Sequence, residues 1–347
     1  MSIPRSLLGA AALATTLVGC AVAQRPASES PAPAAVPTGY LVVANQQSRD
    51  ASIITLPAGT ERRVMVGVGP HEAAIAPGGA WGVVTVYGNR DSIGNRLALV
   101  DLAAGTVLRH VDLGQYTRPH AAVPLPGPGR RMLVTSETTR NVVIVDLDAG
   151  RVEAAIPTEA PGSHMVAVTA DGTRAFTANM PAGSVSEIDL TRRALVRTIL
   201  VGQQMTEGIA VTPDGREVWV GSNASGIVSV IDTGTGTVVA TVPGFRVPYR
   251  LAISPDAALV AVVDPETGSL TLITAATRTL AATVDLGASP RGVVFTPDGR
   301  TAFVTVVAPD ASGAVVAVDV ASRAIVGRFA VGTAPDGVTF QPGAARD

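Results

Sequence analysis

The chain has 347 residues, 47% of them hydrophobic, and its 26 basic and 28 acidic residues leave a formal net charge of −2. This balance argues against nucleic-acid binding, because a surface that binds phosphates carries a basic excess. Every Lys or Arg position is an arginine, which excludes Schiff-base chemistry on a lysine amine.

The N-terminal segment is predicted to direct export. Arg5 precedes an apolar run over residues 7–18, which is too short to span a bilayer comfortably. Residues 17–20 (LVGC) resemble the lipobox of bacterial lipoproteins, in which the cysteine is acylated. We therefore expect residues 1–19 to be a lipoprotein signal peptide and Cys20 to anchor a periplasmic protein to a membrane of a Gram-negative bacterium. Cleavage after Ala23, which would release a soluble periplasmic protein, is the alternative.

The segment 20–38 is predicted to be a tether between the anchor and a folded body. It is rich in Pro, Ala and Ser and has little to bury. Cys20 is the only cysteine, so an intramolecular disulfide is excluded and core packing must hold the fold.

From Tyr40 onward the sequence repeats with a period of roughly 43 residues. An apolar run that ends in a turn recurs as 208–215 (GIAVTPDG), 292–299 (GVVFTPDG) and 250–256 (RLAISPD). A second strand follows each turn, as in 218–222 (VWVGS) and 175–179 (AFTAN), and a third ends in aspartate, as in 228–232 (VSVID) and 142–146 (VVIVD). A fourth strand completes each unit, and the Pro-Asp-Gly sequences suit tight reversals.

Four short antiparallel strands at this period predict an all-β, seven-bladed β-propeller. The sequence contains six complete units and two fragments: residues 40–68 supply three strands and residues 336–341 supply one. We expect strands from both termini to close the last blade, which removes an exposed sheet edge. The propeller should cover residues 39–343, followed by a tail at 344–347. Trp219, Phe176 and Phe303 are expected to pack in the core between blades.

The repeat resembles the YVTN-repeat (YncE-like) family of bacterial seven-bladed propellers. The resemblance rests on second strands such as 176–179 (FTAN) and 42–45 (VVAN), on the TPDG turns and on the third strands that end in aspartate. It implies the fold for residues 40–342. It implies no particular activity, because the shared motifs are turn and core elements.

One further column of the aligned repeats is polar in every unit. It contains the residue that opens each innermost strand, and the position after it is expected to be small or apolar. Three of the four histidines of the chain fall in this column, on consecutive blades. In a closed ring these side chains would surround one mouth of the central channel, so we predict a ligand site there. Its members are His71, His120, His164, Glu207, Tyr249, Arg291 and Asp336.

The ring permits two kinds of chemistry. If His71, His120, His164 and Glu207 converge on one point, they would bind a divalent transition metal with a position left open for water. Such a site would support a lactonase-like or metal-dependent hydrolase. Without a metal, the tyrosine and arginine of the column would hold an anionic or carbonyl-bearing ligand. A solvated channel mouth also accommodates polar residues that have no function.

The function expected from the sequence is that of an exported scaffold that binds a small molecule or a partner protein at the channel mouth. The hydrolase is the alternative. Longer hairpins at residues 87–95 and 307–313 are expected to wall the same mouth, and His110 is expected on an outer surface strand. We predict a monomer that meets the membrane only through the N-terminal lipid.

Overall fold

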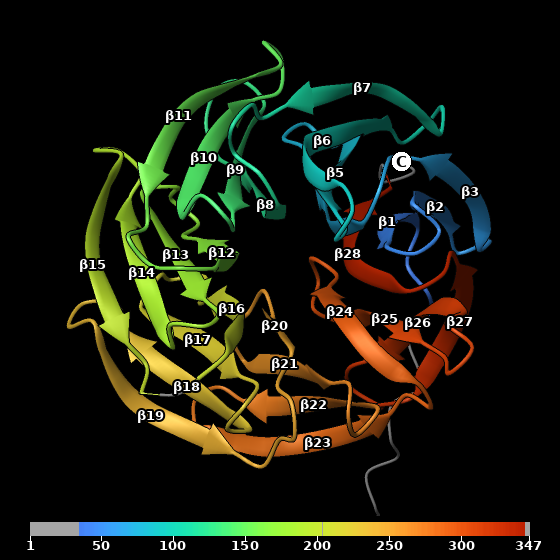
Figure 1. Cartoon of the computed structure of the whole chain (residues 1–347). Helices are drawn as coiled ribbons and strands as arrows, with labels where there is room; N and C mark the ends of the chain where they lie inside the picture. Colours follow the sequence, from blue (N-terminus) through green and yellow to red (C-terminus); the bar gives the residue numbers. More distant parts are fainter. Residues whose placement is uncertain (1–34, 203, 344–347) are drawn as a thin grey trace, which may run out of the picture. The chain divides into compact units, whose positions relative to one another are not determined.

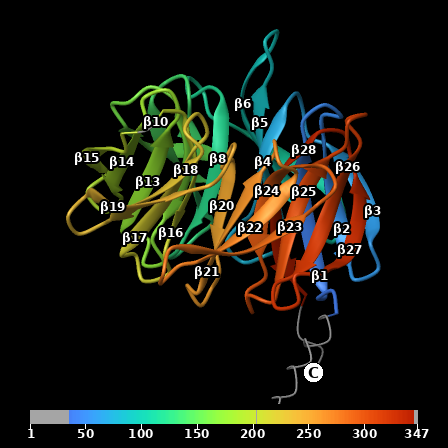
Figure 2. The same ribbon diagram turned by 90° about the horizontal axis from the view of Figure 1, so that it is seen from below.

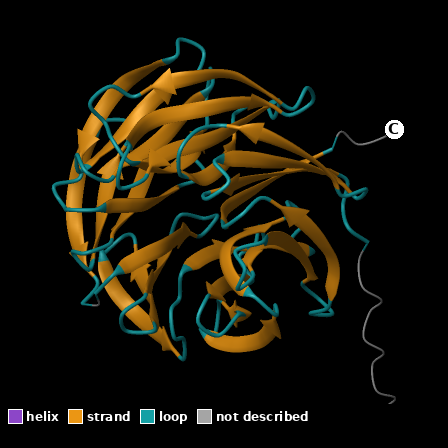
Figure 3. Ribbon diagram, turned by 45° about the vertical axis from the view of Figure 1, so that its right-hand side comes forward, coloured by secondary structure: helices purple, strands orange, loops and turns teal. Residues whose placement is uncertain are grey.

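Seven four-stranded antiparallel sheets surround a central axis. The computed structural model describes residues 35–202 and 204–343, and these contain strands, turns and loops but no helix (Figure 3). The predicted all-β propeller of seven four-stranded blades is therefore confirmed. The predicted signal peptide and lipidation site, most of the tether, and the tail lie outside the described residues.

Six blades are formed by consecutive strands, and in each the first strand lies nearest the axis (Figure 1). Blades 1 and 2 contain β4 (Pro70–Ile75), β5 (Trp81–Gly88), β6 (Ile93–Asp101) and β7 (Thr106–Asp112), then β8 (Pro119–Leu125), β9 (Arg131–Ser136), β10 (Asn141–Asp146) and β11 (Arg151–Pro157). Blades 3 and 4 contain β12 (Ser163–Val168), β13 (Arg174–Asn179), β14 (Ser184–Asp189) and β15 (Ala194–Leu200), then β16 (Thr206–Val211), β17 (Glu217–Ser222), β18 (Ile227–Asp232) and β19 (Thr237–Pro243). Blades 5 and 6 contain β20 (Arg250–Ile253), β21 (Leu259–Asp264), β22 (Ser269–Thr274) and β23 (Thr279–Asp285), then β24 (Ser289–Phe295), β25 (Thr301–Val307), β26 (Gly313–Asp319) and β27 (Ile325–Val331).

Blade 7 is closed by both ends of the propeller. Its sheet has the order β28-β1-β2-β3, with β28 (Pro335–Pro342) innermost, followed by β1 (Gly39–Asn45), β2 (Asp50–Leu56) and β3 (Thr60–Met65). Val43 pairs with Val338 across the β1–β28 ladder, and the Gly343 amide donates to the Thr38 carbonyl at 3.1 Å. The predicted closure is confirmed.

The Thr-Pro-Asp-Gly turns form as their residue types dictate. In blade 4 the Thr212 hydroxyl donates to Asp214 Oδ1 at 2.6 Å, and the Gly215 amide donates to the Thr212 carbonyl at 2.8 Å. Gly215 has a φ of 70°, which glycine adopts without strain. Thr212 Oγ1 also accepts from the Glu217 amide at 3.0 Å, which fixes the start of the next strand.

The hydrophobic core is divided into layers between neighbouring blades. Trp219, Phe176 and Phe303 are all completely buried on second strands, as predicted. One layer joins Phe303 of blade 6 to Leu41 and Val338 of blade 7. This interface beside the closing blade, which we call the seam, therefore packs like the other interfaces. Burial of each large apolar side chain contributes roughly 1.5–3 kcal/mol. Val36, near the end of the predicted tether, packs against the same layer.

Buried threonines on second strands bond to the innermost strand of the next blade. Thr85 Oγ1 donates to the His120 carbonyl at 3.0 Å, and Thr135 Oγ1 donates to the His164 carbonyl at 2.8 Å. Thr305 Oγ1 makes the same bond to the Asp336 carbonyl at 2.6 Å. These bonds hold the backbone of three ring residues against the preceding blade.

In the described part of the chain, no helix has the length and hydrophobicity that a membrane span requires.

Candidate functional site at the channel mouth

Most innermost strands begin with a backbone irregularity at the channel mouth. In blade 3 the register slips between Ser163 and Val166, which leaves His164 in a bulge. A similar slip frames His71 in blade 1 and recurs in blades 2, 4, 6 and 7. β-bulges re-aim side chains and are frequent beside functional sites. The predicted polar column therefore consists largely of bulge residues.

The three imidazoles of the column are stacked. The ring centroids of His71 and His120 are 4.4 Å apart with an interplanar angle of 37°, and those of His120 and His164 are 3.7 Å apart at 40°. Tyr87 lies edge-on to two of the rings, 4.6 Å from His71 and 5.6 Å from His120 between centroids. The stack thus runs across blades 1, 2 and 3, and Tyr87 covers one side of it.

Carboxylates hold both ends of the stack. His71 Nδ1 lies 2.7 Å from Oδ2 of Asp336 at one end. At the other end, His164 Nδ1 lies 2.8 Å from Glu137 Oε1, and its Nε2 lies 3.4 Å from Glu207 Oε1. Both ring nitrogens of His164 thus face carboxylate acceptors, an arrangement that favours the imidazolium form.

Arg250 crosses the channel and was not predicted as a site residue. Its Nη1 donates to Glu207 Oε1 at 2.8 Å, and its Nη2 donates to Glu72 Oε1 at 2.9 Å. The side chains of Arg250, Glu72 and Glu207 are only 5%, 13% and 6% exposed. The expectation that the position after each ring residue is small or apolar is therefore wrong at Glu72 and Arg250, because these two side chains pair across the channel.

Glycines make room for this arrangement. A Cβ on Gly208 would lie 2.6 Å from the Tyr249 carbonyl oxygen, and one on Gly337 would lie 2.6 Å from the Cα of Glu72. Real Cβ atoms do not approach other atoms so closely. Gly208 and Gly337 occupy the position after the ring residue in blades 4 and 7, and each faces the blade that supplies Arg250 or Glu72.

The charged groups of the stack have shifted pKa values. Burial, together with the positive charges of His164 and His71, holds the pKa of His120 well below its ordinary value. Burial opposes protonation of His164, but hydrogen bonds to Glu137 and Glu207 outweigh it and raise its pKa. Burial likewise opposes ionisation of Asp336, but the bond from His71 lowers the pKa of Asp336 to about 2.

We expect His164 to hold its proton to higher pH than His120. In a histidine-edited NMR titration, His164 should titrate above the ordinary value of about 6.5, while His120 should stay neutral well below it. Because the folded pKa of His164 is raised, its contribution to stability is complete below the unfolded pKa and disappears as the pH rises through the folded pKa. A His120 resonance that titrates at or above that of His164 would contradict this assignment.

Tyr249 and Arg291 complete the ring on the opposite side. The Tyr249 ring lies between two guanidinium groups, with its centroid 4.5 Å from Cζ of Arg250 and 5.2 Å from Cζ of Arg291. Burial is the main cause that raises the pKa of the Tyr249 hydroxyl, so it remains a hydrogen-bond donor at neutral pH. Among the described residues, Arg291 has no hydrogen-bond or ion-pair partner.

The two long hairpins lie at this mouth, as their place in the strand order requires. The β5–β6 hairpin projects furthest from the blades (Figure 2). Beside it, a pocket of about 410 Å³ has His71, Tyr87 and Gly88 in its wall. We call this the mouth pocket, and it opens between blades 7 and 1. The second long hairpin joins β25 to β26, where the Ala308 amide donates to the Ser312 carbonyl at 2.9 Å.

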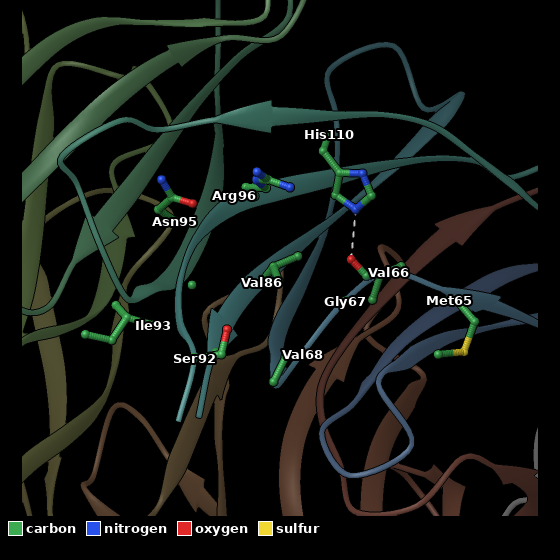
Figure 4. Close-up of a pocket in the computed structure, with 12 residues that line it drawn as sticks. Met65, Val66, Gly67, Val68, Val86, Ser92, Ile93, Asn95, Arg96 and His110 are labelled. Atoms are coloured by element: carbon green, nitrogen blue, oxygen red, sulfur yellow. Dashed lines mark hydrogen bonds between the residues drawn. The ribbon is translucent and has the colours of Figure 1, made fainter. Parts of the chain in front are cut away.

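A second pocket lies on the outer side of the same two blades (Figure 4). Its volume is about 460 Å³, and its wall includes the exposed side chains of Met65 and Ile93. His110 of β7 lies here, with Nε2 2.8 Å from the Val66 carbonyl oxygen, so its predicted place on an outer strand is confirmed. This pocket contains none of the predicted ring residues.

The predicted convergence of His71, His120, His164 and Glu207 on a metal ion is not found. Within residues 35–202 and 204–343, no group of three or more His, Cys, Asp or Glu side chains is arranged to hold a metal. The physical reason is that the stacked rings direct their nitrogens elsewhere, His71 at Asp336 and His164 at Glu137 and Glu207. Two buried side-chain atoms of the predicted column nevertheless have no hydrogen-bond partner in this part of the chain. They are His120 Nδ1 and Asp336 Oδ1.

Comparison with known proteins supports the fold assignment. A family model described as YNCE-like beta-propeller matches residues 176–345. Among solved structures, a chain titled Kuenenia stuttgartiensis hydrazine synthase is similar, with 18% sequence identity and a TM-score of 0.66 over 82% of this chain and 96% of that one. At this identity the likeness shows the fold alone. No match is found among curated proteins. With its seven four-stranded blades and the family match over residues 176–345, the chain has a YncE-like β-propeller fold.

Proposed function

We propose that this propeller is an exported binding module that takes a small ligand at the channel mouth. The observation that carries the proposal is a pocket of about 410 Å³ at the channel mouth, whose wall includes Tyr87 and the ring residue His71. Small-molecule sites typically have volumes of roughly 300–1,000 Å³ and a few convergent polar groups. Recognition of a partner protein at the same face is the other outcome of the test below.

Arg291 supports the proposal because its guanidinium lies beside an aromatic ring and forms no ion pair among the described residues. It lies 5.2 Å from the centroid of Tyr249 and has no carboxylate partner among the described residues. The other channel arginine, Arg250, has two such partners. A planar guanidinium with free donors is suited to a carboxylate, phosphate or carbonyl group of a ligand.

Export belongs to the proposal and rests on residues 17–20 (LVGC) and the apolar run before them. We propose a periplasmic protein that is anchored through a lipid on Cys20. A Cys20→Ser variant should leave the membrane fraction, and retention there would contradict the anchor.

A thermal-shift screen tests ligand binding. The panel contains neutral sugars, amino acids, carboxylates and phosphate monoesters, and each hit is then titrated by calorimetry. A ligand present at 100 times its Kd should stabilise the propeller by about 2.7 kcal/mol. We expect Arg291→Gln to weaken the binding of a hit at least tenfold.

Arg323→Gln is the matched control. It makes the same charge change at an exposed residue in the β26–β27 turn, at the opposite end of the blades. If no panel member raises the Tm, or if both variants bind a hit equally, the small-ligand proposal is wrong. Capture of a protein that Arg291→Gln no longer binds would then favour a protein partner.

A further inference from the structure

We infer that the mouth pocket selects the ligand and that it takes an oxyanion group, either a phosphate or a carboxylate. This inference rests on the proposed function and adds a chemical class to it. It is drawn from the side chains around the pocket, which differ in charge from those of the channel itself.

Arginines from three parts of the chain line the mouth pocket. Arg49 comes from the β1–β2 turn, Arg90 from the β5–β6 hairpin and Arg118 from the loop before β8. The remaining polar side chains of its wall are amides, the His71 imidazole and the Tyr87 hydroxyl, and no Asp or Glu is among the lining residues. In a protein with a net charge of −2, this is a local excess of positive charge.

The carboxylates that contact His71 and Tyr87 are already engaged. Asp336 Oδ2 is bonded to His71, and Glu137 accepts hydrogen bonds from His164 and from the Tyr87 hydroxyl. Among the described residues, the side chains of Arg49 and Arg90 have no ion-pair or hydrogen-bond partner. By contrast, Arg197 on the outermost strand β15 is paired with Glu187 at 2.6 Å. The guanidiniums at the mouth pocket are therefore available to an external anion.

The pocket wall is held in place before any ligand arrives. Arg118 Nη2 donates to the Asn89 carbonyl at 3.1 Å, and its Cζ lies 4.9 Å from the centroid of Tyr87. Asn89 Oδ1 accepts from the Ser92 amide at 2.8 Å, which shapes the hairpin that carries Arg90. Gly88 has a φ of 89°, so a side chain there would be strained and would disturb the hairpin.

Guanidinium groups recognise oxyanions through pairs of parallel N–H···O bonds, and carboxylate and phosphate share the required geometry. Positions fixed by the fold lower the entropy cost of binding. Three arginines and an imidazole around about 410 Å³ therefore fit a multiply charged small anion better than a neutral sugar or an apolar compound.

Calorimetric titration with three probes tests this inference: inorganic phosphate, citrate and glucose, each with the full propeller at two salt concentrations. We expect phosphate or citrate to bind and glucose not to bind, with weaker binding at higher salt. The R49Q/R90Q variant should weaken anion binding at least tenfold. The control R300Q/R323Q removes two exposed charges from the turns at the opposite end of the blades and should bind as the wild type does.

Each outcome decides the inference. Binding of only one of the two anions identifies the oxyanion and supports the inference. Failure of both anions to bind, or equal weakening in both double variants, overturns it. If a neutral compound from the screen binds in an Arg291-dependent way while both anions fail, the proposed function stands and this inference alone is wrong. If nothing in either experiment binds, both are wrong.

Discussion

Replacement of Arg250 by alanine should destabilise the propeller by about 3–5 kcal/mol, the usual cost of removing one partner of a buried ion pair. Arg250 is the group that Glu72 and Glu207 share, and both carboxylates are largely buried. Without it, two negative charges would remain in the channel with little water to solvate them. Equilibrium unfolding in denaturant, followed by tryptophan fluorescence, measures the loss.

Two further variants separate charge from lost volume. Arg246→Ala removes an arginine whose side chain is 74% exposed and 3.8 Å from Glu266, and an exposed pair of this kind is worth roughly 0–1 kcal/mol. The triple variant E72Q/E207Q/R250M keeps the side-chain volume but removes the charges, so it should recover most of the stability. If R250A and R246A lose the same stability, the cross-channel pair contributes nothing measurable.

The fold could be predicted from the sequence because its signals are local and repeated. A turn such as 212–215 needs only its own residues to form, as the bond between Thr212 and Asp214 shows. Aspartates at the ends of third strands act in the same local way, since Asp232 Oδ1 accepts from the Thr235 amide at 2.7 Å. The number of such units then determined the number of blades, and the incomplete first and last units predicted the closure.

The channel could be predicted only in part. Aligned repeats showed which residue opens each inner strand, so the ring positions were found. They did not show which residues lie opposite each other, because the pairing of Glu72 with Arg250 joins positions 178 residues apart. A comparison of charges in the column after the ring would have singled out these two residues. Their charges stand where the other blades have Ala121, Met165, Gly208, Gly292 and Gly337.

The orientation of the imidazoles could not be predicted from the sequence either. Three histidines in one column are compatible with a metal site or with a stack. The choice depends on their hydrogen-bond partners, and one of these, Glu137, lies just after a second strand and outside the column. The carboxylates of Asp336 and Glu137 orient the rings of His71 and His164. The His120 ring packs between these two imidazoles.

Removal of β28 should cost more stability than the roughly 0.5–3 kcal/mol of an ordinary point substitution. Deletion of residues 335–347 would remove the ladder partner of β1 and uncover the layer around Phe303. It would also take away Asp336, on which His71 and Thr305 depend. We expect a protein with a strongly lowered Tm and a broad unfolding transition, measured by circular dichroism.

A peptide added in trans shows whether the loss is due to the open blade. A synthetic peptide with the sequence of residues 333–343, present during refolding, should restore part of the Tm, because an exposed edge such as that of β1 accepts an added strand. A peptide in which Asp replaces Val338 is the matched control, since Val338 is only 8% exposed and packs in the seam. A truncated chain that keeps the wild-type Tm would show that the ring is stable without the innermost strand of blade 7. Equal rescue by both peptides would show that the strand does not act through the packed seam.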